Sequence, residues 1–259
     1  MTPALPDDLE VLQAGDPHAR IALVLHGGGG PQTIAPIVHH LSPSFHALAP
    51  THPGWNGTSR PDDIVSVVAL AAAYLDRLLA DGHRDVILIG SSIGGWIALE
   101  MAAQAAADDK YAGLVGAVVD IDGVGVVVDG EPIADFFALD ARGLAEVAWH
   151  DPDRGYMDPA GFTDQQRAMQ QANRQTMAVV AGREMNDPSL LARLRTIDVP
   201  TLVVFGESDR VVTPAYGRAV TDAIPGAEFV EVPAAGHLPH LENPEATWAA
   251  IDPFLTRSR

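Results

Sequence analysis

The chain has 259 residues, of which 47% are hydrophobic and 19% charged, and it contains no cysteine. This composition excludes a disordered chain and a disulfide-stapled scaffold, and it leaves no thiolate to act as a nucleophile. The formal net charge of −18 argues against nucleic acid and membrane surfaces as partners, because both carry negative charge.

Short apolar runs alternate with helical patterns along the chain. The expected strands are Ile21–Leu25, Phe45–Ala49, Val86–Ile89, Leu114–Ile121, Thr201–Phe205 and Glu228–Val232. The expected helices are Ile64–Leu79, capped by Asp62 and Asp63, then Ile93–Ala107, Pro214–Ala223 and Pro244–Leu255, whose last turn Pro253 should disturb. Strands that are apolar on both faces and alternate with helices indicate an α/β fold with a mostly parallel central sheet flanked by helices.

One segment departs from this alternation of strands and helices. Between residues 123 and 195 no convincing strand follows Val128, and helical stretches rich in Met, Phe and Trp alternate with Pro, Asp and Gly. A structureless loop of that length is uncommon in a compact domain. We therefore predict a core of residues 1–122 and 196–259, with a helical cap inserted at residues 123–195.

The segment GSSIG at residues 90–94 fits the pattern G-x-S-x-G. It stands directly after the Val86–Ile89 strand and directly before the Ile93–Ala107 helix, where a sharp turn presents the central hydroxyl above the sheet. The pattern alone also fits a tight turn with a capping serine, so its position carries the interpretation. Ser92 is the predicted nucleophile.

Four glycines at residues 27–30 follow His26 and the first strand. Acyl transfer needs backbone N–H groups aimed at the developing oxyanion, and glycine lets the backbone approach the substrate closely. We expect Gly28 and Ile93 to form the oxyanion hole, with Gly29 as the second choice in the loop. A flexible loop is the alternative, and we expect His26 to brace the loop.

A serine hydroxyl needs an imidazole to take its proton, and an acid to orient that imidazole. His237 follows the last predicted strand, at the carboxyl end of the sheet, where open α/β sheets bind ligands. The acid should come between the serine and the histidine in the chain, and Asp209 directly follows the Thr201–Phe205 strand. The alternatives are His240 as the base, and Asp120, Asp122 or Glu207 as the acid.

At these residues the chain resembles the α/β-hydrolase superfamily, and within it the small serine hydrolases with a helical cap. The resemblance rests on HGGGG at residues 26–30, HPGWNGTSRP at 52–61, GSSIGG at 90–95, and GESD with GHLPHLENP at 206–209 and 236–244. It implies an ester, thioester, lactone or carbon–carbon-bond substrate, no metal and no organic cofactor. Trp55 and Asn56 depart from the family's turn pattern, and the four glycines favour an esterase.

We therefore predict a carboxylesterase that acts on a small, uncharged ester through a Ser92 acyl-enzyme. The alternatives are a carbon–carbon-bond hydrolase of vinylogous diketones with the same triad, and a non-catalytic small-molecule receptor on the same fold. Large apolar residues of a cap often only form its core. The expected pocket residues are Gly29, Trp96, Phe136, Phe137, Trp149 and Leu238, joined by cap methionines such as Met177.

The N-terminal segment MTPALPDDLEVL lacks the basic and apolar regions of a signal peptide. No apolar run approaches the ~20 residues that a membrane-spanning helix needs. The sequence therefore predicts a cytoplasmic protein.

Overall fold

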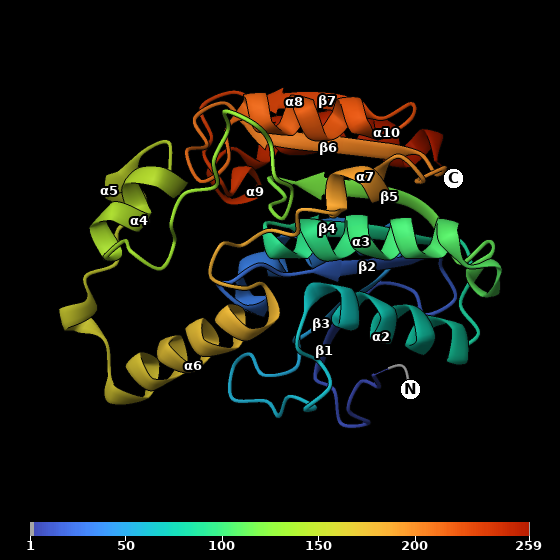
Figure 1. Cartoon of the computed structure of the whole chain (residues 1–259), viewed down its shortest axis with the longest axis horizontal. Helices are drawn as coiled ribbons and strands as arrows, with labels where there is room; N and C mark the ends of the chain where they lie inside the picture. The colour runs from blue at the N-terminus through green and yellow to red at the C-terminus, as the bar shows by residue number, and fades with distance from the viewer. Residues whose placement is uncertain (1–2, 259) are drawn as a thin grey trace.

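The computed structural model describes residues 3–258, which form a seven-stranded sheet with helices on both faces (Figure 1). The strand order is β1-β3-β2-β4-β5-β6-β7. Every neighbouring pair is parallel except β1 with β3. The strands are β1 (Val11–Ala14), β2 (Ile21–Leu25), β3 (His46–Pro50), β4 (Val86–Ser91), β5 (Val115–Ile121), β6 (Thr201–Gly206) and β7 (Glu228–Val232).

The sheet divides the hydrophobic core into two clusters, one on each of its faces. Leu88 of β4 packs in the cluster with α2, α3 and α8, and its neighbours Ile87 and Ile89 pack in the cluster with α1 and α10. Because successive strand residues point to opposite faces, the central strands must be apolar throughout. The helices are α1 (Ala35–Leu41), α2 (Val67–Ala80), α3 (Ile93–Ala107), α4 (Ala141–Ala148), α5 (Pro152–Gly155), α6 (Asp164–Val180), α7 (Leu190–Leu194), α8 (Pro214–Ala223), α9 (Pro239–Glu242) and α10 (Pro244–Arg257), with 3-10 turns η1 (Pro31–Ile34), η2 (Asp109–Tyr111) and η3 (Pro159–Gly161).

The mostly parallel sheet and its flanking helices confirm the predicted fold class. Strand β1 and helix α1 were not predicted, because β1 is a largely exposed edge strand and α1 is a seven-residue helix. An exposed edge strand shows no run of apolar residues in the sequence, so hydrophobic periodicity does not reveal it.

Two predicted helix ends were wrong. Helix α2 begins at Val67, where the Ser66 side chain accepts a hydrogen bond from the Ala69 N–H, so Asp62 and Asp63 do not cap it. Helix α10 continues past Pro253 to Arg257. Pro253 lies on the exposed face of α10, where water can satisfy the carbonyl that loses its helical partner.

A helical insert connects β5 to β6, and its helices α4, α5 and α6 lie on the side of the sheet where α3 begins (Figure 1). Helix α6 is tied to the loop after β3. The Asn56 N–H donates to Asn173 Oδ1 at 2.8 Å, and the Thr176 hydroxyl donates to the Gly54 carbonyl at 2.8 Å. Helix α7 instead packs on the core helix α3. The cap boundaries at residues 123 and 195 stay a prediction.

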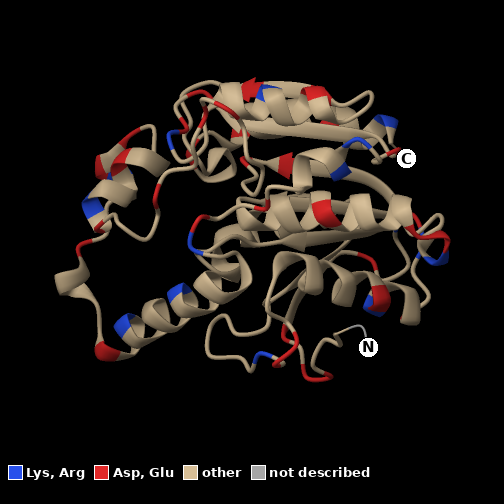
Figure 2. Cartoon of the chain, in the orientation of Figure 1, with Lys and Arg blue, Asp and Glu red and all other residues tan. Residues whose placement is uncertain are grey.

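Acidic side chains are distributed over both the core helices and the insert, with fewer basic residues between them (Figure 2). This spread accords with the formal net charge of −18. Within residues 3–258, no helix combines the length and the apolar character that crossing a membrane requires.

Candidate active site

Ser92 sits in a strained turn between β4 and α3. Its φ of 59° and ψ of −119° lie in a region that residues with a side chain rarely adopt, at a typical cost of about 1–3 kcal/mol. The turn is so tight that a Cβ on Gly90 would lie 2.0 Å from the Gly94 carbonyl oxygen. A Cβ on Gly94 would lie 2.0 Å from the carbonyl oxygen of Leu25 in β2. Glycine is therefore required on both sides of Ser92.

Ser92, His237 and Asp209 form a continuous hydrogen-bonded chain. Ser92 Oγ lies 2.9 Å from His237 Nε2, and His237 Nδ1 lies 2.8 Å from Asp209 Oδ2. His237 and Asp209 are buried, with 6% and 2% of their surface exposed. The other oxygen of Asp209 accepts the N–H groups of Val211 and Val212. These contacts fix the carboxylate so that it holds the imidazole with Nε2 facing the serine.

The loop that carries His237 is held against the insert. The His237 N–H donates to the Ala148 carbonyl at 2.7 Å. The carboxylate of Glu242 accepts the N–H of Gly236 and the N–H of His150, each at 2.7 Å. Glu242 therefore joins the histidine loop to the end of α4.

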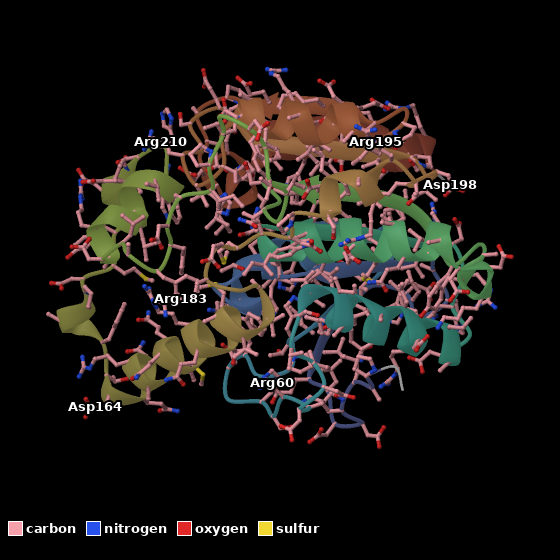
Figure 3. The ribbon with its side chains drawn as sticks, in the orientation of Figure 1. Arg60, Asp164, Arg183, Arg195, Asp198 and Arg210 are labelled. Carbon is pink, nitrogen blue, oxygen red and sulfur yellow. The ribbon has the colours of Figure 1, made fainter. Side chains whose placement is uncertain are left out.

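The loop that carries Asp209 holds the same helix. Arg210 lies beside α4 in Figure 3, where its guanidinium donates to the carbonyls of Glu146 and Trp149 at the end of that helix. A cation at a helix C-terminus is favoured by the helix dipole. The end of α4 is thereby fixed against both loops that supply the histidine and its acid.

The glycine loop lies against Ser92. A Cβ on Gly27 would lie 2.8 Å from Ser92 Cβ, and a Cβ on Gly28 would lie 2.8 Å from Sδ of Met177. Ile93 is the first residue of α3, so its N–H has no intrahelical partner. Within residues 3–258, the Gly28 N–H has no hydrogen-bond acceptor either. Both N–H groups predicted for the oxyanion hole are therefore free, and Gly27, which we did not predict, lies closer to Ser92 than Gly28 does.

Two buried histidines brace this loop, as predicted for His26. His26 Nδ1 lies 2.7 Å from the Gly27 carbonyl, and His26 Nε2 accepts the His52 N–H at 3.0 Å. His52 in turn contacts the Tyr74 hydroxyl and the His26 carbonyl. Burial lowers the pKa of His26 to about 4, and burial and His26 lower the pKa of His52. Both rings are neutral at physiological pH, which suits a structural role.

His240 was the alternative base, and Asp120 and Asp122 were two of the alternative acids. His240 binds the Thr33 carbonyl instead of Ser92, and burial lowers its pKa to about 4. Burial raises the pKa of Asp120 to about 7. Asp122 lies close, since Asp122, Asp209 and His237 each offer an atom within 4.8 Å of the others. This trio has the composition of a metal site, but Asp209 and His237 already bind each other.

A cavity of about 630 Å³ is lined by residues of the segment between β5 and β6. Val126 lines it, and Val124, two residues earlier in the chain, donates its N–H to the Ser92 carbonyl at 3.4 Å. Phe137 lines the cavity, but Ser92 and His237 do not. Arg183 also lines it and lies between α4 and α6 in Figure 3.

The other predicted pocket residues do not line this cavity. Trp96 is buried under Gly125, where an added Cβ would lie 2.3 Å from the indole, and Trp149 packs on Gly155 in the same way. Phe136 lies with its ring 6.1 Å from that of Phe137. Gly29 is exposed and Leu238 half-buried. Their role in substrate binding stays a prediction.

The strained serine, its buried partners and the glycine loop agree with one family. The sequence profile of the alpha/beta hydrolase family matches residues 22–250. The chain belongs to the alpha/beta hydrolase family. The match confirms the resemblance seen in the sequence and covers every residue of the hydrogen-bonded chain.

Individual relatives of this hydrolase carry different names. The chain is 26% identical over 254 residues to the pimeloyl-[acyl-carrier protein] methyl ester esterase of Stenotrophomonas maltophilia, covering 90% of this chain and 92% of that protein. A 66-residue stretch is 46% identical to a Mycobacterium tuberculosis protein that carries the name of a non-heme bromoperoxidase, but this match spans only 25% of either chain. An Acinetobacter baumannii AYE structure described as a lipase superposes with a TM-score of 0.80, at 22% identity, over 100% of this chain and 91% of that one. At that identity, the superposition shows the fold alone.

Proposed function

We propose that this hydrolase is a carboxylesterase that cleaves a small, uncharged ester through an acyl-enzyme on Ser92. The observation that carries the proposal is the chain of hydrogen bonds from Ser92 Oγ to His237 and on to Asp209. The S. maltophilia relative, whose name is that of a methyl ester esterase, supports an ester as the substrate.

The geometry supplies each step of acyl transfer. His237 Nε2 takes the Ser92 proton as Oγ attacks the ester carbonyl, and the new oxyanion accepts the N–H groups of Gly28 and Ile93. His237 then gives that proton to the leaving alcohol, and the acyl group stays on Ser92. Water, deprotonated by His237, attacks the acyl-enzyme, and the acid leaves as Ser92 regains its proton. Asp209 stabilises the imidazolium in both halves.

The charges around the cavity support an uncharged substrate. Carboxylates of Asp129, Glu131, Asp135 and Glu184 line it, against one guanidinium, that of Arg183. A lining with this excess of negative charge repels an anionic group. We place the acyl or alcohol chain of the substrate against this cavity.

Steady-state hydrolysis of p-nitrophenyl esters of rising acyl length tests the proposal. Wild type should hydrolyse the short esters, and Ser92→Ala should abolish that hydrolysis. Ser91→Ala is the matched control, because the buried Ser91 hydroxyl has no hydrogen-bond partner within residues 3–258 and should be dispensable. A wild type that cleaves a vinylogous diketone but no ester would replace the esterase by the carbon–carbon-bond hydrolase.

A further inference from the structure

Asp122 occupies an unusual position at the end of β5. Its backbone φ of 47° lies in the left-handed region, and its N–H donates to the Val204 carbonyl at 2.9 Å. Left-handed backbone at a residue other than glycine is uncommon and clusters at functional sites. The bend turns a fully buried carboxyl group from β5 toward the Asp209 loop at the end of β6.

Two carboxyl groups therefore meet behind His237. Each offers an oxygen within 4.8 Å of the other and of a His237 nitrogen, and neither is accessible to water. Two carboxylates that share a buried site cannot both carry a charge at low cost, so one of them keeps a proton. The hydrogen-bond donors around each group decide which one.

The donors favour charge on Asp209. Its two oxygens receive the N–H groups of Val211 and Val212 and the imidazole of His237. Asp122 receives only the Gly206 N–H, on Oδ1 at 2.9 Å, and within the described residues Oδ2 has no donor. Hydrogen bonds to the charged form favour that form, so the proton belongs to Asp122.

We propose that Asp122 is a positioning residue that stays protonated and donates its carboxyl O–H to the Asp209 carboxylate, holding Asp209 as the charged partner of His237. This inference rests on the proposed function. The charged groups that face Asp122 are Asp209, Asp120 and His237. Burial raises the pKa of Asp122 far above its ordinary value, followed by the charge of Asp209 and a hydrogen bond with Asp209, and Asp120 contributes less.

Two variants separate the O–H donor from the bulk of the side chain. Asp122→Asn keeps the left-handed backbone, which asparagine tolerates, and offers an N–H donor to Asp209. Asp122→Gly tolerates the same backbone and removes the donor. We expect kcat of Asp122→Asn within a few-fold of wild type, and kcat of Asp122→Gly lower by about 10- to 100-fold, the size expected for one lost charge-assisted hydrogen bond. KM should change little in either variant.

The pH profile distinguishes this role from a merely structural one. In wild type, raising the pH ionises Asp122 and places two charges side by side, so activity should fall on the alkaline side. Asp122→Asn cannot ionise, so its profile should extend further into alkaline pH. Equal kcat values and superimposable profiles for wild type and both variants would overturn the proposal.

An infrared measurement tests the proton without any turnover. The spectrum of wild type minus Asp122→Asn at neutral pH should contain the carbonyl band of a protonated carboxylic acid, and Glu207→Gln, at an exposed acid of the loop after β6, serves as the matched control. A carboxylate band in its place would overturn the proposal even in an active esterase. A protonated band in a protein that hydrolyses no ester would support the proton on Asp122 while the proposed function failed.

Discussion

Replacing Asp209 by asparagine should disable the enzyme without unfolding it. Oδ1 of Asp209 faces the N–H groups of Val211 and Val212 at 2.8 and 3.3 Å. In Asp209→Asn, the amide oxygen must keep that position, because an NH₂ group there would face two donors. The NH₂ then faces His237 Nδ1, which must accept its hydrogen bond and give up its own proton.

The consequence is the wrong tautomer of His237. With its proton on Nε2, the ring cannot accept the Ser92 proton across their 2.9 Å contact. Loss of the correct tautomer in a serine triad lowers kcat by about 10⁴-fold, or about 5 kcal/mol in the activation barrier. Stopped assays with a p-nitrophenyl ester measure kcat, and circular dichroism melting checks the fold.

Glu207→Gln is the matched control for this prediction. Glu207 lies two residues away, is exposed, and within residues 3–258 its side chain accepts only the Ala234 N–H, at 3.0 Å. The kcat of Glu207→Gln should equal that of wild type. If Asp209→Asn kept kcat within tenfold of wild type, or if Glu207→Gln lost as much as Asp209→Asn, the assignment of the acid would be refuted.

Three further predictions concern the supporting structure. Gly94→Ala places a Cβ 2.0 Å from the Leu25 carbonyl oxygen, so it should lower the unfolding free energy by at least about 1–3 kcal/mol and lower Tm. Gly161→Ala is the control, because no atom lies within 4 Å of its new Cβ, and it should melt like wild type. The folded pKa of His240, about 4, lies below its unfolded value of about 6.5, so wild type should lose stability relative to His240→Gln by up to about 1.4 kcal/mol per pH unit as the pH falls from 6.5 to 4 in urea titrations. The folded pKa of Asp120, about 7, lies above its unfolded value. As the pH rises from 4 to 7, Asp120→Asn should therefore gain unfolding free energy relative to wild type, by up to about 1.4 kcal/mol per pH unit. A stability difference between the two proteins that does not change with pH would contradict the burial of Asp120 as a neutral acid.

The sequence predicted the parts of the site that local patterns encode. Ser92 could be predicted because its glycines and the flanking strand and helix form one continuous segment. His237 and Asp209 could be predicted because each follows an apolar run that is typical of a strand. These patterns reflect backbone crowding and chain order, which a single sequence records directly.

The missed features depend on contacts between distant segments. The nearness of Asp122 to Asp209 follows from the pairing of β5 with β6, and the count of donors around each acid is visible only in three dimensions. The close approach of Gly27 to Ser92 likewise follows from the pairing of β2 with β4. Of the predicted pocket residues, Phe137 lines the cavity. Apolar residues in a helical insert look alike in sequence whether they face a cavity or each other.

Covalent labelling by a fluorophosphonate, read by intact-mass spectrometry and peptide mapping, tests the central claim that Ser92 is an activated nucleophile. Wild type and Ser91→Ala should each gain the mass of one label, mapped to Ser92, while Ser92→Ala should gain none. An intact, folded wild type that stays unlabelled, or a label that persists in Ser92→Ala, would contradict the account.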